Sequence, residues 1–189
     1  MTFFPSPRSA FLLLVVVVLL GAVGYRSLTS SSSSAADAAP VGDGRLPEGT
    51  SVYDEDHAGI TELDPDLLRA LRQAATDAAG DDVDIVVNSG WRSPSYQKRL
   101  LDEAVTKYGS RAEAARWVAT PQASPHVAGD AVDVGPTAAT TWLAANGARY
   151  GLCRIYDNEP WHYELRPEAT DQGCPPRYPD PTHDPRTQR

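Results

Sequence analysis

The stretch SPHVAGDAVD, Ser124 to Asp133, joins a polar loop to a short apolar strand. His126 lies in the loop, and Asp133 lies on the expected strand over residues 131–134. Gly129 stands between them and lets the chain turn, since it has no Cβ. We therefore expect the imidazole of His126 and the carboxylate of Asp133 to face one point.

A further histidine, His162, follows in the sequence EPWHYE on another predicted strand. Two imidazole nitrogens and one carboxylate oxygen suit a zinc ion, and three protein ligands leave a fourth position for water. His126, Asp133 and His162 therefore predict a site for one zinc ion. The other histidines, His57 and His183, lie in an acidic N-terminal stretch and in the C-terminal tail.

An additional carboxylate, Glu159, precedes His162 by three positions. A carboxylate beside zinc takes a proton from the attacking water and later delivers it to a leaving amine, which completes a hydrolase. Glu159 has the residue type and the location for that role. The alternative is that these side chains are ordinary polar groups at strand edges, with each histidine held by hydrogen bonds.

The surrounding segments alternate between helical and strand-like patterns. Asp64 and Pro65 begin a helix with an apolar face that Gly80 closes. In chain order we expect helix 65–80, strand 83–87, helices 94–108 and 111–118, strand 131–134, helix 137–145, and strands 154–156 and 161–165. This order indicates the α+β class, with a small, mostly antiparallel sheet and flanking helices.

The N-terminal residues 1–26 are interpreted as an export signal. Residues 11–23, FLLLVVVVLLGAV, are uncharged and follow Arg8, which favours export. The run is short for a helix that crosses a hydrocarbon core of about 30 Å. A cleaved signal peptide and an anchor in the cytoplasmic membrane both stay open. We therefore expect an extracytoplasmic protein, secreted or anchored and facing the cell wall.

Composition divides the rest of the chain. Residues 27–50 are rich in Ser and Ala and predict a disordered linker, and the proline-rich tail 175–189 predicts disorder as well. The folded domain is then 51–174. Because thiols oxidise outside the cytoplasm, we expect Cys153 and Cys174, the two cysteines of the chain, to form a disulfide.

The net charge limits the partners. Lys and Arg number 17 against 25 Asp and Glu, giving a formal net charge of -8. A broad basic surface is therefore excluded, and we expect no nucleic-acid partner. We expect the chain to act as a monomer.

The metal-binding motifs resemble a known family. The pattern S-x-H-x-x-G-x-A-x-D at residues 124–133, followed by E-x-W-H at 159–162, is similar to the VanY-type D-alanyl-D-alanine carboxypeptidase family of zinc peptidases. The upstream SGWRS at 89–93, with Gln97 after it, resembles the same family. The resemblance covers about residues 88–165 and implies the small α+β fold that is shared with the hedgehog signalling domain.

The resemblance also implies an activity: hydrolysis of the C-terminal D-Ala of peptidoglycan stem peptides, with Glu159 as general base and then general acid. It implies that Arg92 stabilises the oxyanion, and a fixed guanidinium suits the charge that develops there. Ser124 and Gln97 are candidates for binding the substrate's carboxylate or peptide groups, or they only stabilise loops. Arg154 is a further candidate for the carboxylate, or an ion-pair partner.

Other functions remain open at this point. The same chemistry would serve an L,D-carboxypeptidase or a peptidoglycan endopeptidase of the same fold. A non-catalytic wall-binding domain that keeps zinc for structure is a different class, and a structural site needs neither Glu159 nor Arg92.

Overall fold

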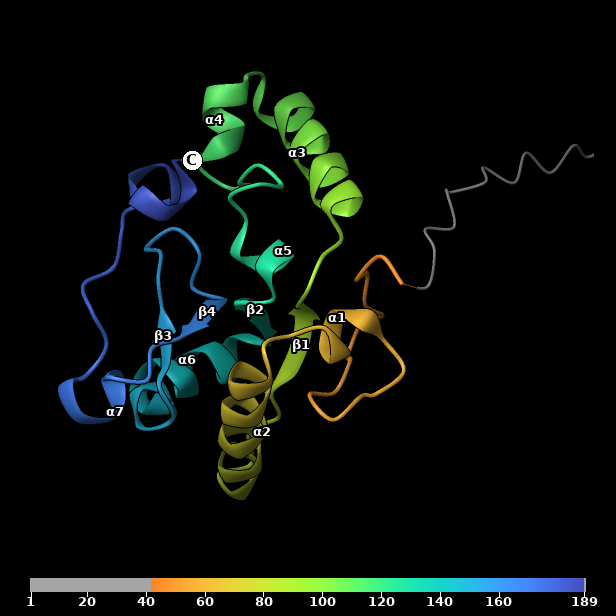
Figure 1. Ribbon diagram of the computed structural model, residues 1–189. Coiled ribbons are helices and arrows are strands. Elements are labelled where there is room, and N and C mark those ends of the chain that lie inside the picture. The colour runs from red at the N-terminus through yellow and green to blue at the C-terminus, as the bar shows by residue number, and fades with distance from the viewer. Residues whose placement is uncertain (1–41, 189) are drawn as a thin grey trace, which may run out of the picture. The chain divides into compact units, whose positions relative to one another are not determined.

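The computed structural model describes residues 42–188, and a four-stranded antiparallel sheet lies at its centre (Figure 1). The strands run in the order β1-β2-β4-β3. Their bounds are β1 Val86–Ser89, β2 Ala131–Gly135, β3 Leu152–Arg154 and β4 His162–Leu165. The predicted α+β class with a small antiparallel sheet is confirmed.

Helices surround this sheet (Figure 1). The α-helices are α1 Ala58–Thr61, α2 Pro65–Gly80, α3 Pro94–Tyr108, α4 Arg111–Ala115, α5 Pro125–Ala128, α6 Thr137–Asn146 and α7 Ala169–Gln172. Short 3-10 helices cover Gly147–Tyr150, Pro181–His183 and Pro185–Thr187.

Helix α2 shows why the local sequence folds as it does. The carboxylate of Asp64 accepts hydrogen bonds from the backbone N–H groups of Asp66 and Leu67, at 2.9 and 3.0 Å, which satisfies donors that the first turn leaves free. The apolar face of the helix buries Leu67 and Leu71 in a core that it shares with Val132 of β2. Burial of each leucine contributes about 1.5–3 kcal/mol, so α2 fixes one face of the sheet.

The strand register places the chemistry. Asp133 on β2 lies opposite His162 on β4, and on the other side it lies opposite Ser89 of β1. Directly opposed residues of an antiparallel pair project from the same face of the sheet, with Cβ atoms about 4.5–5.5 Å apart. The sheet therefore sets Asp133 and His162 side by side before any metal is considered.

Several elements differ from their predicted bounds. Strand β1 begins three residues later than expected, because the N–H of Val83 donates to the carbonyl of Ala78 and closes the end of α2. Strand β3 ends at Arg154, since Tyr156 forms a bridge with Tyr178 instead. Helix α4 ends at Ala115, where the chain turns.

The prediction of a disordered tail over 175–189 is wrong for residues 175–188. The N–H of Tyr178 donates to the carbonyl of Ile155 at 2.9 Å, and Asp180 and Asp184 are buried. A high proline content predicts that a segment lacks long helices and strands. Here ion pairs and buried carboxylates hold the segment against the domain although it has no long helix or strand. The folded domain therefore extends beyond the predicted boundary at Cys174.

The predicted linker 27–50 is also too long. Asp43 is buried and accepts a hydrogen bond from Arg99 at 2.6 Å, while its carbonyl accepts from the N–H of Ser93. Residues 42–50 are thus part of the domain, because Asp43 is held both at its carboxylate and at its backbone carbonyl. The export segment 1–26 and the earlier part of the linker lie outside the described residues. Within 42–188, no helix has the length and apolarity needed to cross a membrane.

Cys153 and Cys174 form a disulfide, as expected, with their Cα atoms 5.5 Å apart. The bond fastens β3 to the start of the C-terminal residues. Glu159 and His162 lie within the loop that it closes.

Candidate metal centre and active site

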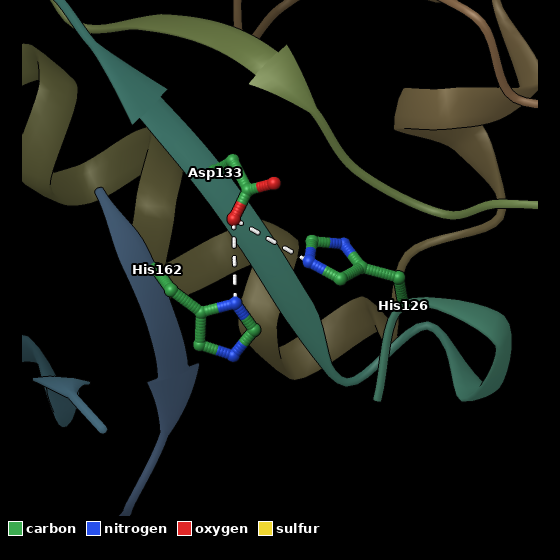
Figure 2. A group of neighbouring side chains, drawn as sticks. All are labelled: His126, Asp133 and His162. Carbon is green, nitrogen blue, oxygen red and sulfur yellow. Dashed lines mark hydrogen bonds and ion pairs between the residues drawn. The ribbon is translucent and has the colours of Figure 1, made fainter. Parts of the chain in front are cut away.

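Three side chains from separate elements converge on one point (Figure 2). His126 comes from α5, Asp133 from β2 and His162 from β4. Nε2 of His126 lies 3.4 Å from Oδ1 of Asp133, and Nδ1 of His162 lies 3.3 Å from the same oxygen. All three ligand atoms lie within 4.8 Å of one another.

These separations fit a zinc ion. Ligand atoms at about 2.0–2.1 Å from a tetrahedral zinc are about 3.3 Å apart, which matches both distances to Asp133. The His126 and His162 rings meet edge to face, with centroids 5.1 Å apart. The donor set predicted from sequence is therefore brought together in a geometry that accepts this metal.

The remaining nitrogen of each imidazole has a partner that fixes the ring. Nδ1–H of His126 donates to the carbonyl of Gly90 at 2.8 Å, and Nε2–H of His162 donates to Oε1 of Glu164 at 3.2 Å. Such partners set the tautomer and turn the other nitrogen towards a metal. The other nitrogen of each ring is then the one that lies beside Asp133 and could bind a metal.

Glu164 is a functional residue that the sequence motifs did not indicate. Its side chain is completely buried and accepts from Arg166 at 2.5 Å and from Arg186 at 2.6 Å. Burial raises the pKa of this carboxyl, but the hydrogen bonds from His162 and Arg186 outweigh it and hold the pKa below its usual range. The available signal was the spacing: Glu164 is two residues after His162 on one strand, so both point to the same face.

Glu159 lies beside this centre in a dry position. Its Oε2 is 3.7 Å from Nδ1 of His162, and its Oε1 is a buried oxygen without a hydrogen-bond partner among residues 42–188. Burial raises the pKa of Glu159 to about 7. A carboxylate with a free oxygen and a pKa near neutrality is suited to accept and return a proton.

Arg92 contacts the centre through the second oxygen of Asp133. Its Nη2 donates to Oδ2 of Asp133 at 2.7 Å, its Nε to Ser89 at 2.7 Å and its Nη1 to Oε1 of Gln97 at 3.1 Å. Gln97 is buried, and its Nε2 also donates to the carbonyl of Ala119. Gln97 therefore orients the side chain of Arg92. Arg92 in turn binds Asp133, a candidate metal ligand, and the sequence did not indicate that contact.

A cavity of about 530 Å³ opens over these groups, and Ser124 lines it. The hydroxyl of Ser124 is buried and has no partner within the described part of the chain. Tyr108 and Trp117, stacked with ring centroids 5.7 Å apart, form part of the wall. Arg154 is not among the lining residues; it faces Asp157 at 3.7 Å.

Comparison with known proteins agrees with this arrangement. The family model described as VanY, D-alanyl-D-alanine carboxypeptidase, matches residues 60–168. A D-alanyl-D-alanine carboxypeptidase of Enterococcus faecalis is 34% identical, in a match that covers 46% of this chain and 41% of the relative. The chain thus spans less than half the length of that curated relative.

Solved structures show the same similarity. A point mutant of the vancomycin-resistance D,D-pentapeptidase VanY, in complex with Zn(II), is 30% identical with a TM-score of 0.52, over 55% of this chain and 72% of that one. VanYB in complex with D-alanine-D-alanine is 29% identical with a TM-score of 0.54, over 59% and 78%.

The L,D-carboxypeptidase DacB from Streptococcus pneumoniae is 26% identical with a TM-score of 0.50, over 59% of this chain and 71% of that one. The family match includes every residue of the centre in Figure 2 and the carboxylate beside it. The chain belongs to the VanY D-alanyl-D-alanine carboxypeptidase family.

Proposed function

We propose that this chain is a zinc-dependent D-alanyl-D-alanine carboxypeptidase that removes the C-terminal D-Ala from peptidoglycan stem peptides. The observation that carries the proposal is Glu159, a buried carboxylate with a free oxygen, next to three converging metal ligands. Its relatives support the metal and the substrate: one VanY structure contains Zn(II), and VanYB was solved with D-alanine-D-alanine.

One zinc ion would be held by Nε2 of His126, Oδ1 of Asp133 and Nδ1 of His162. When bound, zinc supplies a Lewis acid that acidifies water and polarises the scissile carbonyl. The chain itself orients those ligands, through Gly90 on one ring and Glu164 on the other.

Glu159 moves the proton. Its Oε1 accepts a proton from the attacking water as the water oxygen forms a bond to the scissile carbonyl carbon. The same carboxyl then donates that proton to the amine nitrogen of D-alanine as the carbon–nitrogen bond breaks. Burial raises the pKa of Glu159 above its usual range, which favours return of the proton from this carboxyl to the leaving amine.

Arg92 and Ser124 would bind and orient the substrate. The guanidinium of Arg92 holds Asp133 through Oδ2, and its remaining N–H groups are available to a developing oxyanion in the cavity. The unpartnered hydroxyl of Ser124 offers a hydrogen bond to a peptide or carboxylate group of the substrate.

Purified protein incubated with muropeptides of defined length tests the proposal by mass analysis of the products. We expect a pentapeptide ending in D-Ala-D-Ala to lose one alanine, a chelator to stop the reaction, and added zinc to restore it. Cleavage of tetrapeptides alone would instead support the L,D-carboxypeptidase that DacB represents, and cleavage of cross-links would support an endopeptidase. A zinc-loaded protein that cleaves none of them would contradict an enzymatic function.

We further propose that the enzyme acts outside the cytoplasm as a monomer, with residues 1–26 directing export. The apolar run 11–23 after Arg8 supports this location. Cell fractionation tests it, and recovery of the full-length chain in the cytoplasmic fraction would contradict it.

A further inference from the structure

We propose that Arg186 is a positioning residue for His162, acting through Glu164, so that the C-terminal segment, residues 175–188, is part of the metal centre. This inference rests on the proposed function, since it assumes that His162 binds zinc. It goes further because it assigns a role in the site to a segment that lies outside the family match at 60–168.

The contacts form a continuous chain from the segment to the ligand. Arg186 donates from Nη1 to Oε2 of Glu164 at 2.6 Å and from Nη2 to Oε1 at 3.3 Å. Oε1 is also the oxygen that accepts Nε2–H of His162 at 3.2 Å. A two-point contact of this kind fixes the orientation of a carboxylate as well as its charge. Arg186 thereby fixes the group that aligns the imidazole.

The contact between Arg186 and Glu164 matters because Glu164 is buried. Glu164 has no exposed surface, so its charge is stabilised by protein groups rather than by water. Its cationic partners among the described residues are Arg166 and Arg186, apart from His162 itself. Removal of Arg186 would leave one arginine on a completely buried carboxylate.

The same guanidinium holds a second group behind His162. Arg186 donates to Asp184, which is also buried and accepts from the hydroxyl of Tyr156 at 3.0 Å. The ring of Tyr156 packs on His162, with centroids 5.0 Å apart. Arg186 therefore supports the imidazole through Glu164 at its Nε2 edge and through Asp184 and Tyr156 against its ring.

The rest of the segment is anchored independently of Arg186. The carboxylate of Asp180 accepts a hydrogen bond at 3.0 Å from Nε of Arg116, which lies in the turn after α4. The backbone N–H of Tyr178 donates to the carbonyl of Ile155. The disulfide at Cys174 fixes the residue before the segment begins, and Figure 1 shows the C-terminal end beside α4. A change at Arg186 alone should therefore disturb the zinc site without releasing the segment.

The test measures zinc affinity, by competition with a chromogenic chelator, in the full chain and in Arg186→Met. Loss of a partner behind a metal-binding histidine typically costs about 10–100-fold in metal affinity, and we expect the zinc dissociation constant to rise by that factor. The visible spectrum of the Co(II)-substituted protein should change as well, because the ring of His162 is reoriented. Arg186→Lys keeps the charge but not the two-point contact, so we expect an intermediate affinity.

Arg177→Met is the matched control. Arg177 belongs to the same segment and donates to the exposed Asp157 at 2.5 Å, but it contacts neither Glu164 nor Asp184. We expect its zinc affinity to stay within about twofold of the unmodified protein, since an exposed ion pair that contacts no metal ligand has little effect. Circular dichroism checks that each variant is folded.

Glu164→Gln, alone and combined with Arg186→Met, tests the route. Because Arg186 acts mainly through Glu164, with a smaller contribution through Asp184 and Tyr156, we expect the two losses of affinity to be clearly less than additive in the double variant. Additive losses, or an Arg186→Met protein that binds zinc as tightly as the unmodified chain, would overturn the inference. If Arg186→Met does not fold, Arg186→Lys against Arg177→Lys decides, and equal affinities would overturn it. An unmodified protein that binds no zinc would instead overturn the proposed function.

Discussion

Removal of the disulfide should destabilise the domain by an amount that the structure lets us estimate. Cys153 and Cys174 are 21 positions apart and close a loop that contains Glu159 and His162. In the chain-entropy treatment, closing a loop of this length stabilises the folded state by about 3 kcal/mol. For a domain of this size that corresponds to a fall in melting temperature of roughly 10 °C.

The variant is Cys153→Ala with Cys174→Ala, because Cys153 is buried and serine would place a hydroxyl in an apolar cluster. Urea unfolding followed by circular dichroism measures the free energy of unfolding. Both proteins are compared at one fixed concentration of free zinc, since metal binding adds to apparent stability.

Reductant supplies the control. The chain contains only two cysteines, so reductant should destabilise the unmodified protein to the level of the double variant and leave the variant unaffected. A loss smaller than about 1 kcal/mol would refute the reasoning that this loop depends on the disulfide.

Three further predictions follow from single positions. Ser124→Ala should leave the melting temperature unchanged or raise it, because its buried hydroxyl has no partner among residues 42–188, while kcat/KM for a D-Ala-D-Ala peptide falls about tenfold or more; an unchanged kcat/KM would remove Ser124 from the site. Arg92→Lys should lower kcat by at least about 100-fold, since an ammonium cannot replace three directed bonds; steady-state kinetics within tenfold of the unmodified enzyme would contradict this. Gly129→Ala should lower the free energy of unfolding more than Gly109→Ala does. Both residues have positive φ, at 84° and 79°, so alanine is strained at either position. A Cβ on Gly129 would also lie 2.7 Å from the carbonyl oxygen of Glu62, whereas nothing lies within 4 Å of a Cβ on Gly109. We expect about 1 kcal/mol for Gly109→Ala and more for Gly129→Ala in denaturant unfolding, and equal losses would count against the close contact.

Signals that act over a few residues allowed the sequence to predict much of the fold. Asp64 and Ser93 cap α2 and α3, and each is followed by Pro, so these helices begin where expected. The convergence of His126, Asp133 and His162 was predictable because strand patterns and a glycine turn lie between them. The short helix α5 that carries His126 was not, because four residues give too little periodicity.

Contacts between residues that are far apart in the chain could not be predicted from the sequence. The ion pair between Glu164 and Arg186 joins residues 22 positions apart, and nothing in the local pattern of either indicates it. The segment around Arg186 is proline-rich, so composition favoured disorder, although buried carboxylates fix its position. The bond from Arg92 to Asp133 likewise spans 41 positions and depends on the register of the sheet.

In the proposed reaction Glu159 performs the proton transfer at a zinc site that cleaves D-Ala from a peptide. The most direct measurement compares release of D-alanine from a pentapeptide by the unmodified protein and by Glu159→Gln, with zinc content determined for both. Because Glu159 is not one of the three converging ligands, we predict one zinc per chain in each protein and D-alanine release only in the unmodified one. Continued release by zinc-loaded Glu159→Gln, or no release by the zinc-loaded unmodified protein, would contradict the claim.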